Sequence, residues 1–274
     1  MGSMRTGGRT VCPPTAFAQS LTEELIARAG VGPGMRVLVP EAGTGDVAFL
    51  VAERVGDGGS VLATDEDAAA IAAARSKARE QRFHQVEFRE QAFDELSFDQ
   101  PFDAVVSRFF LMHRADPVAT LRRVSSALHG GGRLVVHEWH YESMLWDDTS
   151  EWPDLPLYRR FARWSVETMR RGGAHVDMGL RLVNAFAEAG LPLPTLRTDL
   201  HAVHGSGASG YAFFEETMRE LLPSMERLGV ANASDVAVDT FAQRLEEETV
   251  TMRGHAFLPL QVGAFARIES GRAA

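Results

Sequence analysis

The chain has 274 residues, and 45% of them are hydrophobic, which is enough for a sizeable core in one large domain or in a domain with a lid. Its 28 basic and 37 acidic residues give a net charge of −9, and the absence of a basic run argues against a nucleic-acid partner. The sequence has no apolar stretch of transmembrane length and no signal peptide, so we expect a cytoplasmic protein without a membrane partner.

The N-terminal region divides into a linker-like segment and a helix. Residues 1–14 are rich in glycine, threonine and proline, and we predict a flexible segment there. The single cysteine, Cys12, lies in this segment and excludes an internal disulfide. Apolar residues four apart at Phe17, Leu21 and Leu25 predict a helix that ends at Gly30.

Residues 36–65 have the order strand, glycine turn, helix, strand, acidic residue. An apolar run at 37–40 precedes the turn at 41–46, and a second apolar run at 61–64 ends at Asp65. A glycine turn after a first parallel strand lets a ligand approach the backbone at a helix N-terminus. An acid after the second strand accepts hydrogen bonds from ribose hydroxyls. This order predicts a site for a cofactor that contains a nucleoside.

Strands and helices continue to alternate up to residue 140. We predict a helix over 66–81, strands over 86–88, 102–107 and 133–137, and a helix that begins at Asp116 with Pro117 in its first position. This alternation indicates a parallel sheet with right-handed crossovers.

The pattern changes after His140. Residues 141–175 form an aromatic-rich insert whose helix starts near Pro156, and its aromatic side chains either only pack that helix or cover a substrate. We then predict a helix over 178–189, a strand over 195–204, and further helices over 211–228 and 234–249. The last strand, over 255–267, contains Pro259 and Gly263 and is expected to be interrupted.

Three blocks of this sequence, at 33–45, 102–108 and 128–136, resemble motifs of class I S-adenosylmethionine (SAM)-dependent methyltransferases, in the family's order and at its spacing. The run at 109–117 resembles the ubiquinone-methyltransferase-like group of small-molecule enzymes. The resemblance implies an α/β, Rossmann-like fold with a seven-stranded, mostly parallel sheet and an antiparallel last strand beside the fifth. Residues 15–274 are then one methyltransferase domain, with helical inserts at about 141–175 and 208–250 forming a substrate lid.

The same resemblance implies SAM as cofactor, with S-adenosylhomocysteine as its product. The backbone at 42–45 lines the cofactor, Gly43 and Gly45 allow close approach, and Asp65 meets the ribose unless it caps the next helix. The segment 91–93 lies near adenine and residues 107–108 lie beside the methionine part, where Arg108 alternatively forms a surface ion pair. The predicted cofactor contacts are Glu41, Ala42, Gly43, Gly45, Asp65, Gln91, Ala92, Phe93, Ser107 and Arg108.

Two residues depart from the family pattern. Val39 stands where the first motif usually has an acid, and Glu41 stands where it usually has a glycine. Glu41 either supplies a displaced carboxylate for the SAM ammonium group or marks weakened cofactor binding.

Methyl transfer requires alignment of the reactants and exclusion of water more than it requires a reactive side chain. A hydroxyl acceptor would also need a base, and the candidates at strand ends are His113, Glu138 and His140. His113 alternatively caps a helix or lies in the core. The sequence shows no metal-ligand cluster, so no metal is expected.

The expected function is methyl transfer to a small, partly apolar acceptor in bacterial specialised metabolism, such as natural-product biosynthesis. O-methylation is the first expectation, and C- and N-methylation stay open. The alternative is a SAM-binding enzyme of this fold that catalyses a cyclisation or an elimination, and a third reading is a non-enzymatic scaffold. A homodimer is left open.

Overall fold

The computed structural model describes residues 16–146 and 153–269, so the segment 1–14 and Cys12 lie outside the described residues. The described chain forms two compact units. The sheet unit contains residues 18–140, 177–199 and 261–269, and the helical unit contains residues 16–17, 141–146, 153–176 and 200–260.

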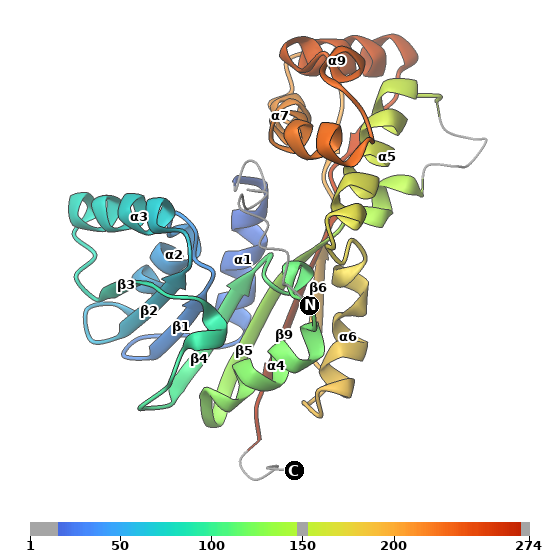
Figure 1. Cartoon of the computed structure of the whole chain (residues 1–274). Coiled ribbons are helices and arrows are strands. Elements are labelled where there is room, and N and C mark those ends of the chain that lie inside the picture. Colours follow the sequence, from blue (N-terminus) through green and yellow to red (C-terminus); the bar gives the residue numbers. More distant parts are fainter. Residues whose placement is uncertain (1–15, 147–152, 270–274) are drawn as a thin grey trace. The chain divides into compact units, whose positions relative to one another are not determined.

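Within the described residues, the strands of the sheet unit form one seven-stranded sheet in the order β3-β2-β1-β4-β5-β9-β6 (Figure 1). Strands β1, β2, β3 and β4 pair in parallel, as does β4 with β5, whereas β9 is antiparallel to β6 and lies next to β5. The predicted fold class is confirmed. The strand bounds are β1 Arg36–Pro40, β2 Ser60–Asp65, β3 Val86–Glu90, β4 Phe102–Arg108, β5 Leu128–His140, β6 Thr195–Asp199 and β9 Leu260–Arg267.

Helices pack on both faces of this sheet (Figure 1). Helices α1 (Ala16–Arg28), α2 (Asp46–Val55) and α3 (Ala68–Gln81) share one hydrophobic core with alternate residues of the strands, among them Val37 and Val39. Helices α4 (Pro117–Ser126) and α6 (Met178–Glu188) pack against each other and against β5. Burial of both faces accounts for the continuous apolar runs of the central strands.

Helix starts follow their capping residues. Asp116 caps α4 by accepting a hydrogen bond from the backbone of Ala119, as the sequence predicts. Asp67 caps α3 and accepts from the backbone of Ala69 and Ala70. The capping alternative for Asp65 is therefore wrong, because the helix begins two residues later than expected.

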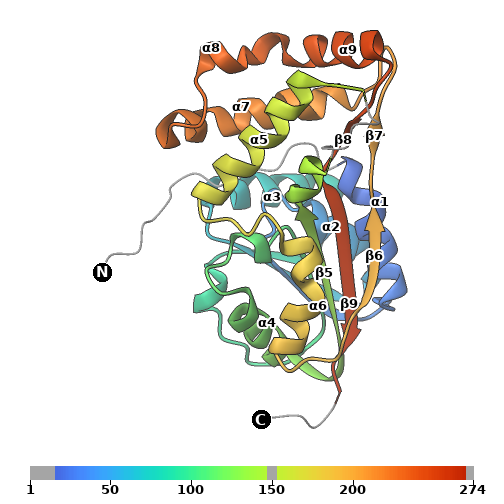
Figure 2. The same ribbon diagram turned by 90° about the vertical axis from the view of Figure 1, so that its right-hand side faces the viewer.

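The helical unit consists mainly of α5 (Pro156–Arg171), α7 (Tyr211–Leu228), α8 (Ala233–Val236) and α9 (Phe241–Met252). Figure 2 shows α5 crossing α7, and the rings of Phe161 and Phe214 meet there at 4.9 Å. Glu248 in α9 accepts hydrogen bonds from the backbone of Leu157 and Tyr158 and so caps α5. The two predicted inserts thus pack in one unit, and their role as a lid stays a prediction.

Two predicted elements are broken in the structure. The strand expected over 195–204 is divided into β6 and β7 (Ala202–Val203), and β7 pairs with β8 (Ala256–Phe257). The helix expected over 234–249 ends at Ala237, which adopts a left-handed conformation with φ 46°, and restarts as α9. Pro259 falls between β8 and β9, so the expected interruption of the last strand is confirmed.

Candidate functional site

The glycine turn links the end of β1 to α2. Ala42 donates its backbone N–H to the carbonyl of Thr64 at 2.9 Å, which fastens the turn to the end of β2. Gly43 and Gly45 both have positive φ. A Cβ added to Gly43 would meet nothing within 4 Å, whereas one added to Gly45 would lie 2.9 Å from Phe49 and Phe88. Gly43 therefore leaves room for a ligand to approach the backbone, and Gly45 allows close packing instead.

Asp65 fastens the same turn from the neighbouring strand. Its side chain is buried, with the residue 1% exposed, and one carboxylate oxygen accepts the Gly43 N–H at 2.7 Å. The other oxygen accepts the Asp67 N–H at 3.0 Å. The predicted ribose acid and the close-approach glycine are thus in direct contact.

The start of α2 carries a carboxylate. Asp46 forms ion pairs with Lys77 at 3.0 Å and with Arg108 at 3.9 Å. A helix N-terminus that binds a pyrophosphate would bring the two negative groups together, so Asp46 argues against a dinucleotide. The Arg108 side chain is only 7% exposed, and that of Asp46 is 29% exposed. The surface ion pair considered for Arg108 is therefore a largely buried one. The preceding residue, Ser107, is also buried.

The segment after β3, residues 91–93, is partly or fully buried. Gln91 donates from its side-chain amide to the carbonyl of Glu95 at 3.1 Å, and both Gln91 and Ala92 are partly buried. Phe93 is 2% exposed and packs edge-on against Phe110 with ring centroids 5.3 Å apart. The Phe93 ring thus packs in the core, and its expected place near adenine stays a prediction.

Three loops meet through an arginine that sequence reasoning missed. Arg114 donates to Glu41 at 3.2 Å and also to Asp94. Glu41 keeps the left-handed backbone of the glycine it replaces, with φ 46°. Its side chain is 19% exposed, and that of Arg114 is 20% exposed. Residues in three separate loops carry no common periodicity, so only the sheet topology brings these charges together.

Glu138 is buried beneath the loop that follows β4. One of its oxygens accepts the N–H groups of Phe110 at 3.0 Å and Leu111 at 2.7 Å, and the other lies 3.4 Å from the N–H of Met112. Burial, with a smaller contribution from the nearby Glu41 carboxylate, raises the pKa of Glu138 to about 8 against the lowering effect of the three backbone N–H groups. Glu138 thus positions this loop, and its expected role as a base stays a prediction that this geometry disfavours.

Two histidines remain as base candidates. The Nδ1 atom of His140 lies 3.1 Å from the carbonyl of Asp177. A carbonyl only accepts, so Nδ1 carries the hydrogen and the lone pair of the neutral ring is on Nε2. His113 ends the short 3-10 turn Leu111–His113 and is exposed, so it is not a core residue.

His137 is a buried neutral histidine on β5. Its Nδ1 atom lies 3.0 Å from the hydroxyl of Thr22. Burial, with a smaller contribution from the nearby Arg108 cation, lowers the pKa of His137 to about 3. The ring therefore stays uncharged at neutral pH and has a structural role.

An aromatic pair lies at the carboxyl ends of β4 and β5. Phe109 and Trp139 stack with centroids 4.8 Å apart and an interplanar angle of 14°. Phe109 is partly exposed and adopts φ 55°, which is uncommon for a bulky residue. Trp139 is 1% exposed, so it backs the Phe109 ring, which alone offers apolar surface here.

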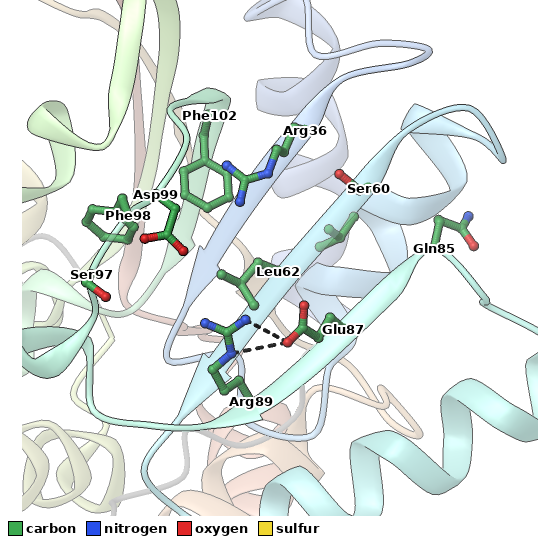
Figure 3. Close-up of a pocket in the computed structure, with 11 residues that line it drawn as sticks. Arg36, Ser60, Leu62, Gln85, Glu87, Arg89, Ser97, Phe98, Asp99 and Phe102 are labelled. Carbon is green, nitrogen blue, oxygen red and sulfur yellow. Dashed lines mark hydrogen bonds and ion pairs between the residues drawn. The ribbon is translucent and has the colours of Figure 1, made fainter.

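Two hollows lie away from the glycine turn. Figure 3 shows one of about 140 Å³ near the amino ends of β1, β2 and β4, lined by Arg36, Ser60 and Phe102 among others. Because ligands of such sheets bind beyond the carboxyl ends of the strands, this hollow is not the cofactor site. The other, of about 440 Å³, lies in the helical unit beside His204 and His255.

Two negative findings apply to residues 16–146 and 153–269. No group of three or more histidine, cysteine, aspartate or glutamate residues has a metal-binding arrangement there. No helix in those ranges combines the length and apolar character needed to cross a membrane.

Comparison with known proteins matches residues 32–175 to the family described as "Methyltransferase domain". The ubiquinone/menaquinone biosynthesis C-methyltransferase of Xanthomonas campestris pv. campestris is 36% identical over 126 residues, which cover 44% of this chain and 49% of that relative. The relative from Shewanella baltica is 33% identical over 113 residues, which cover 40% of this chain and 45% of that relative. The chain thus spans about half the length of the curated relatives it matches.

Solved structures share the fold. The YcgJ protein from Bacillus subtilis has a TM-score of 0.58 at 18% identity, and the match covers 92% of this chain and 99% of the YcgJ chain. The (4+2)-cyclase SpnF has a TM-score of 0.53 at 20% identity, and the match covers 93% of this chain and 82% of the SpnF chain. The sheet order, the antiparallel β9 and the glycine turn together define a class I methyltransferase fold. The family match spans more than half of the chain, which therefore belongs to the methyltransferase-domain family, whose class I members use SAM.

Proposed function

We propose that this protein transfers the methyl group of SAM to a small, partly apolar metabolite. The observation that carries the proposal is the open glycine turn at Gly43, held by Asp65 at the carboxyl ends of β1 and β2. SAM supplies an electrophilic methyl group on a sulfonium. The acidic residues Glu41 and Asp65 suit a cationic cofactor, and Asp46 disfavours a pyrophosphate.

The residues of this site supply positioning. Gly43 admits the cofactor to the backbone, and the carboxylate of Asp65 lies beside it as the acceptor for a ribose hydroxyl. The partly exposed ring of Phe109, stacked on the buried Trp139, is the apolar surface against which the acceptor packs. We assign the acceptor proton to Nε2 of His140 and keep His113 as the rival base.

Oxygen is the first expected acceptor atom, whereas the names of the curated relatives favour carbon. A panel of phenols, hydroxyquinones and aliphatic alcohols incubated with SAM tests this directly. Methyl transfer gives a product heavier by one methylene, and NMR then distinguishes an O-methyl from a C-methyl group. A product of unchanged mass would instead support a cyclisation, a reaction suggested by the name of SpnF and by the departures at Val39 and Glu41.

Replacement of His140 by glutamine should lower kcat for a hydroxyl acceptor by about 100-fold or more, because a positioned base contributes at least that factor. The affinity for S-adenosylhomocysteine should stay within about twofold of wild type. His113→Gln is the matched control and should retain most of the activity. The assignment is wrong if His113→Gln is the variant that loses activity.

A further inference from the structure

We propose that the outer edge of β6 pairs antiparallel with the β6 edge of a second copy of this chain, so that two sheet units join in one continuous sheet. Strand β6 is the terminal strand of the seven-stranded sheet, and Figure 2 shows it beside β9. Of the strands in residues 16–146 and 153–269, none pairs with its outer edge. The unpaired backbone groups of such an edge can bind a strand of another chain. The proposal does not depend on the reaction that the protein catalyses.

Exposed leucines are concentrated around this edge. Leu193 is 68% exposed, Leu196 is 36% exposed and Leu200 is 44% exposed. They are three of the eight large hydrophobic side chains that are exposed among the described residues. Apolar side chains gathered in one exposed place indicate a protein–protein contact. The strand itself contains no proline, and its two charged residues have opposite signs, so neither proline nor like charges protect this edge.

Two-fold symmetry restricts the register of the pair. Each residue keeps its face of the sheet when the axis is perpendicular to the sheet, so the axis passes through a residue position. An axis at Arg197 or Asp199 would place like charges opposite each other, which is unfavourable. An axis at Thr195 or Leu196 would leave both charges without an opposite charge. An axis at Thr198 places Arg197 of each copy opposite Asp199 of the other, and it is the register we propose.

The same register matches the two faces of the joined sheet. Side chains alternate along a strand, so Arg197 and Asp199 lie on one face and Leu196 lies on the other. On the second face, Leu196 is set against Leu200 of the other copy. Arg197 also donates to Glu24 of α1 at 2.9 Å, and its side chain is 43% exposed. A guanidinium has five N–H donors, so the bond to Glu24 is compatible with an ion pair to the second copy.

Sedimentation velocity of the full chain over a range of concentrations tests the dimer. Wild type should change from monomer to dimer in the micromolar range, because a short strand pair makes a small interface. Arg197→Asp and Asp199→Arg each create two pairs of like charges and should weaken dimerisation by about 10- to 100-fold. Arg54→Asp makes the same charge change at an exposed position on α2 and should leave dimerisation unchanged.

An equimolar mixture of the two weakened variants gives a sharper result. In a mixed dimer, Arg197→Asp supplies two acidic residues and Asp199→Arg supplies two basic ones, so both pairs regain opposite charges. The mixture should dimerise within about threefold of the wild-type affinity, although neither variant pairs well with itself. A variant that failed to fold could not recover in this way, so the mixture separates a lost interface from a lost fold.

The position of the axis is tested by crosslinking. Cys12→Ser removes the native thiol, and Thr198→Cys in that background should be linked efficiently by a bis-maleimide with a span of about 8 Å, because opposite residues have Cβ atoms about 4.5–5.5 Å apart. Thr195→Cys lies three positions from the axis, so its two thiols are about 20 Å apart and should not be linked.

Four results would overturn the proposal. They are a wild type that stays monomeric at high micromolar concentration, a dimer that Arg197→Asp leaves intact, a mixture of the two charge variants that stays monomeric, and equal crosslinking at positions 195 and 198.

Discussion

Asp65→Ala is expected to lower the affinity for S-adenosylhomocysteine by at least about 100-fold and to lower the free energy of unfolding by about 2–4 kcal/mol. The carboxylate accepts the N–H groups of Gly43 and Asp67 in a buried environment. Each donor left without an acceptor costs about 1–3 kcal/mol. The glycine turn would lose one of its two hydrogen bonds to the end of β2, and the ribose would lose its acceptor. Calorimetric titration and urea unfolding measure the two effects.

Asp67→Ala is the control for this prediction. Asp67 caps α3 through the backbone N–H groups of Ala69 and Ala70, and loss of such a cap costs about 1 kcal/mol. The affinity of the Asp67→Ala protein for S-adenosylhomocysteine should match that of wild type. Asp65→Asn keeps one acceptor oxygen and should be more stable than Asp65→Ala, yet still bind weakly. An Asp65→Asn protein with wild-type affinity would contradict the role of the carboxylate.

Glu138→Ala should have the largest effect on stability, a loss of about 3–5 kcal/mol in the free energy of unfolding. The substitution leaves the N–H groups of Phe110 and Leu111 buried without an acceptor and opens a cavity. Glu138→Gln keeps a carbonyl oxygen for both donors and should lose about 1 kcal/mol or less at pH 7. Urea unfolding of the three proteins checks this order. Similar losses for alanine and glutamine would show that the two hydrogen bonds matter little.

The raised pKa of Glu138 predicts a pH dependence. Its folded-state pKa of about 8 exceeds the ordinary value of 4.5, so its contribution to stability is complete below pH 4.5 and is lost as pH rises towards 8. Wild type should therefore lose about 1.4 kcal/mol more than Glu138→Gln between pH 7 and 9. Parallel stability curves for the two proteins would refute the raised pKa.

His137 makes stability depend on pH in the opposite direction, and it does not affect the comparison between pH 7 and 9. Its folded-state pKa of about 3 lies below the ordinary value of 6.5, so its contribution is present above pH 6.5 and is lost as pH falls. Above pH 7 the ring is largely neutral in both the folded and the unfolded protein. The comparison between pH 7 and 9 therefore reports mainly on Glu138.

The parts of the fold that follow local rules were predictable. Capping at Asp116, the glycine turn and the apolar runs of the strands gave the correct order of elements in the sheet unit. The break at Ala237 was missed because alanine rarely adopts a positive φ, so the residue itself carries no signal of a helix end.

The site was predictable where contacts are local in the motif, and less so where they depend on tertiary packing. Gly43 and Asp65, which the sequence assigns separately to the cofactor site, lie in contact because they belong to neighbouring parallel strands and the turn between them. Phe93 was expected near adenine and Glu138 was a candidate base, and their burial by packing against other loops was not predicted. Arg114 contacts Glu41 across 73 positions, a pairing that no spacing rule encodes.

The measurement that tests the central claim most directly is calorimetric titration of the purified protein with SAM, S-adenosylhomocysteine and NAD in parallel. The open turn at Gly43, the carboxylate of Asp65 and the acidic start of α2 predict micromolar binding of the first two ligands and no binding of NAD. Binding of NAD, or no binding of either SAM or S-adenosylhomocysteine, would contradict the account.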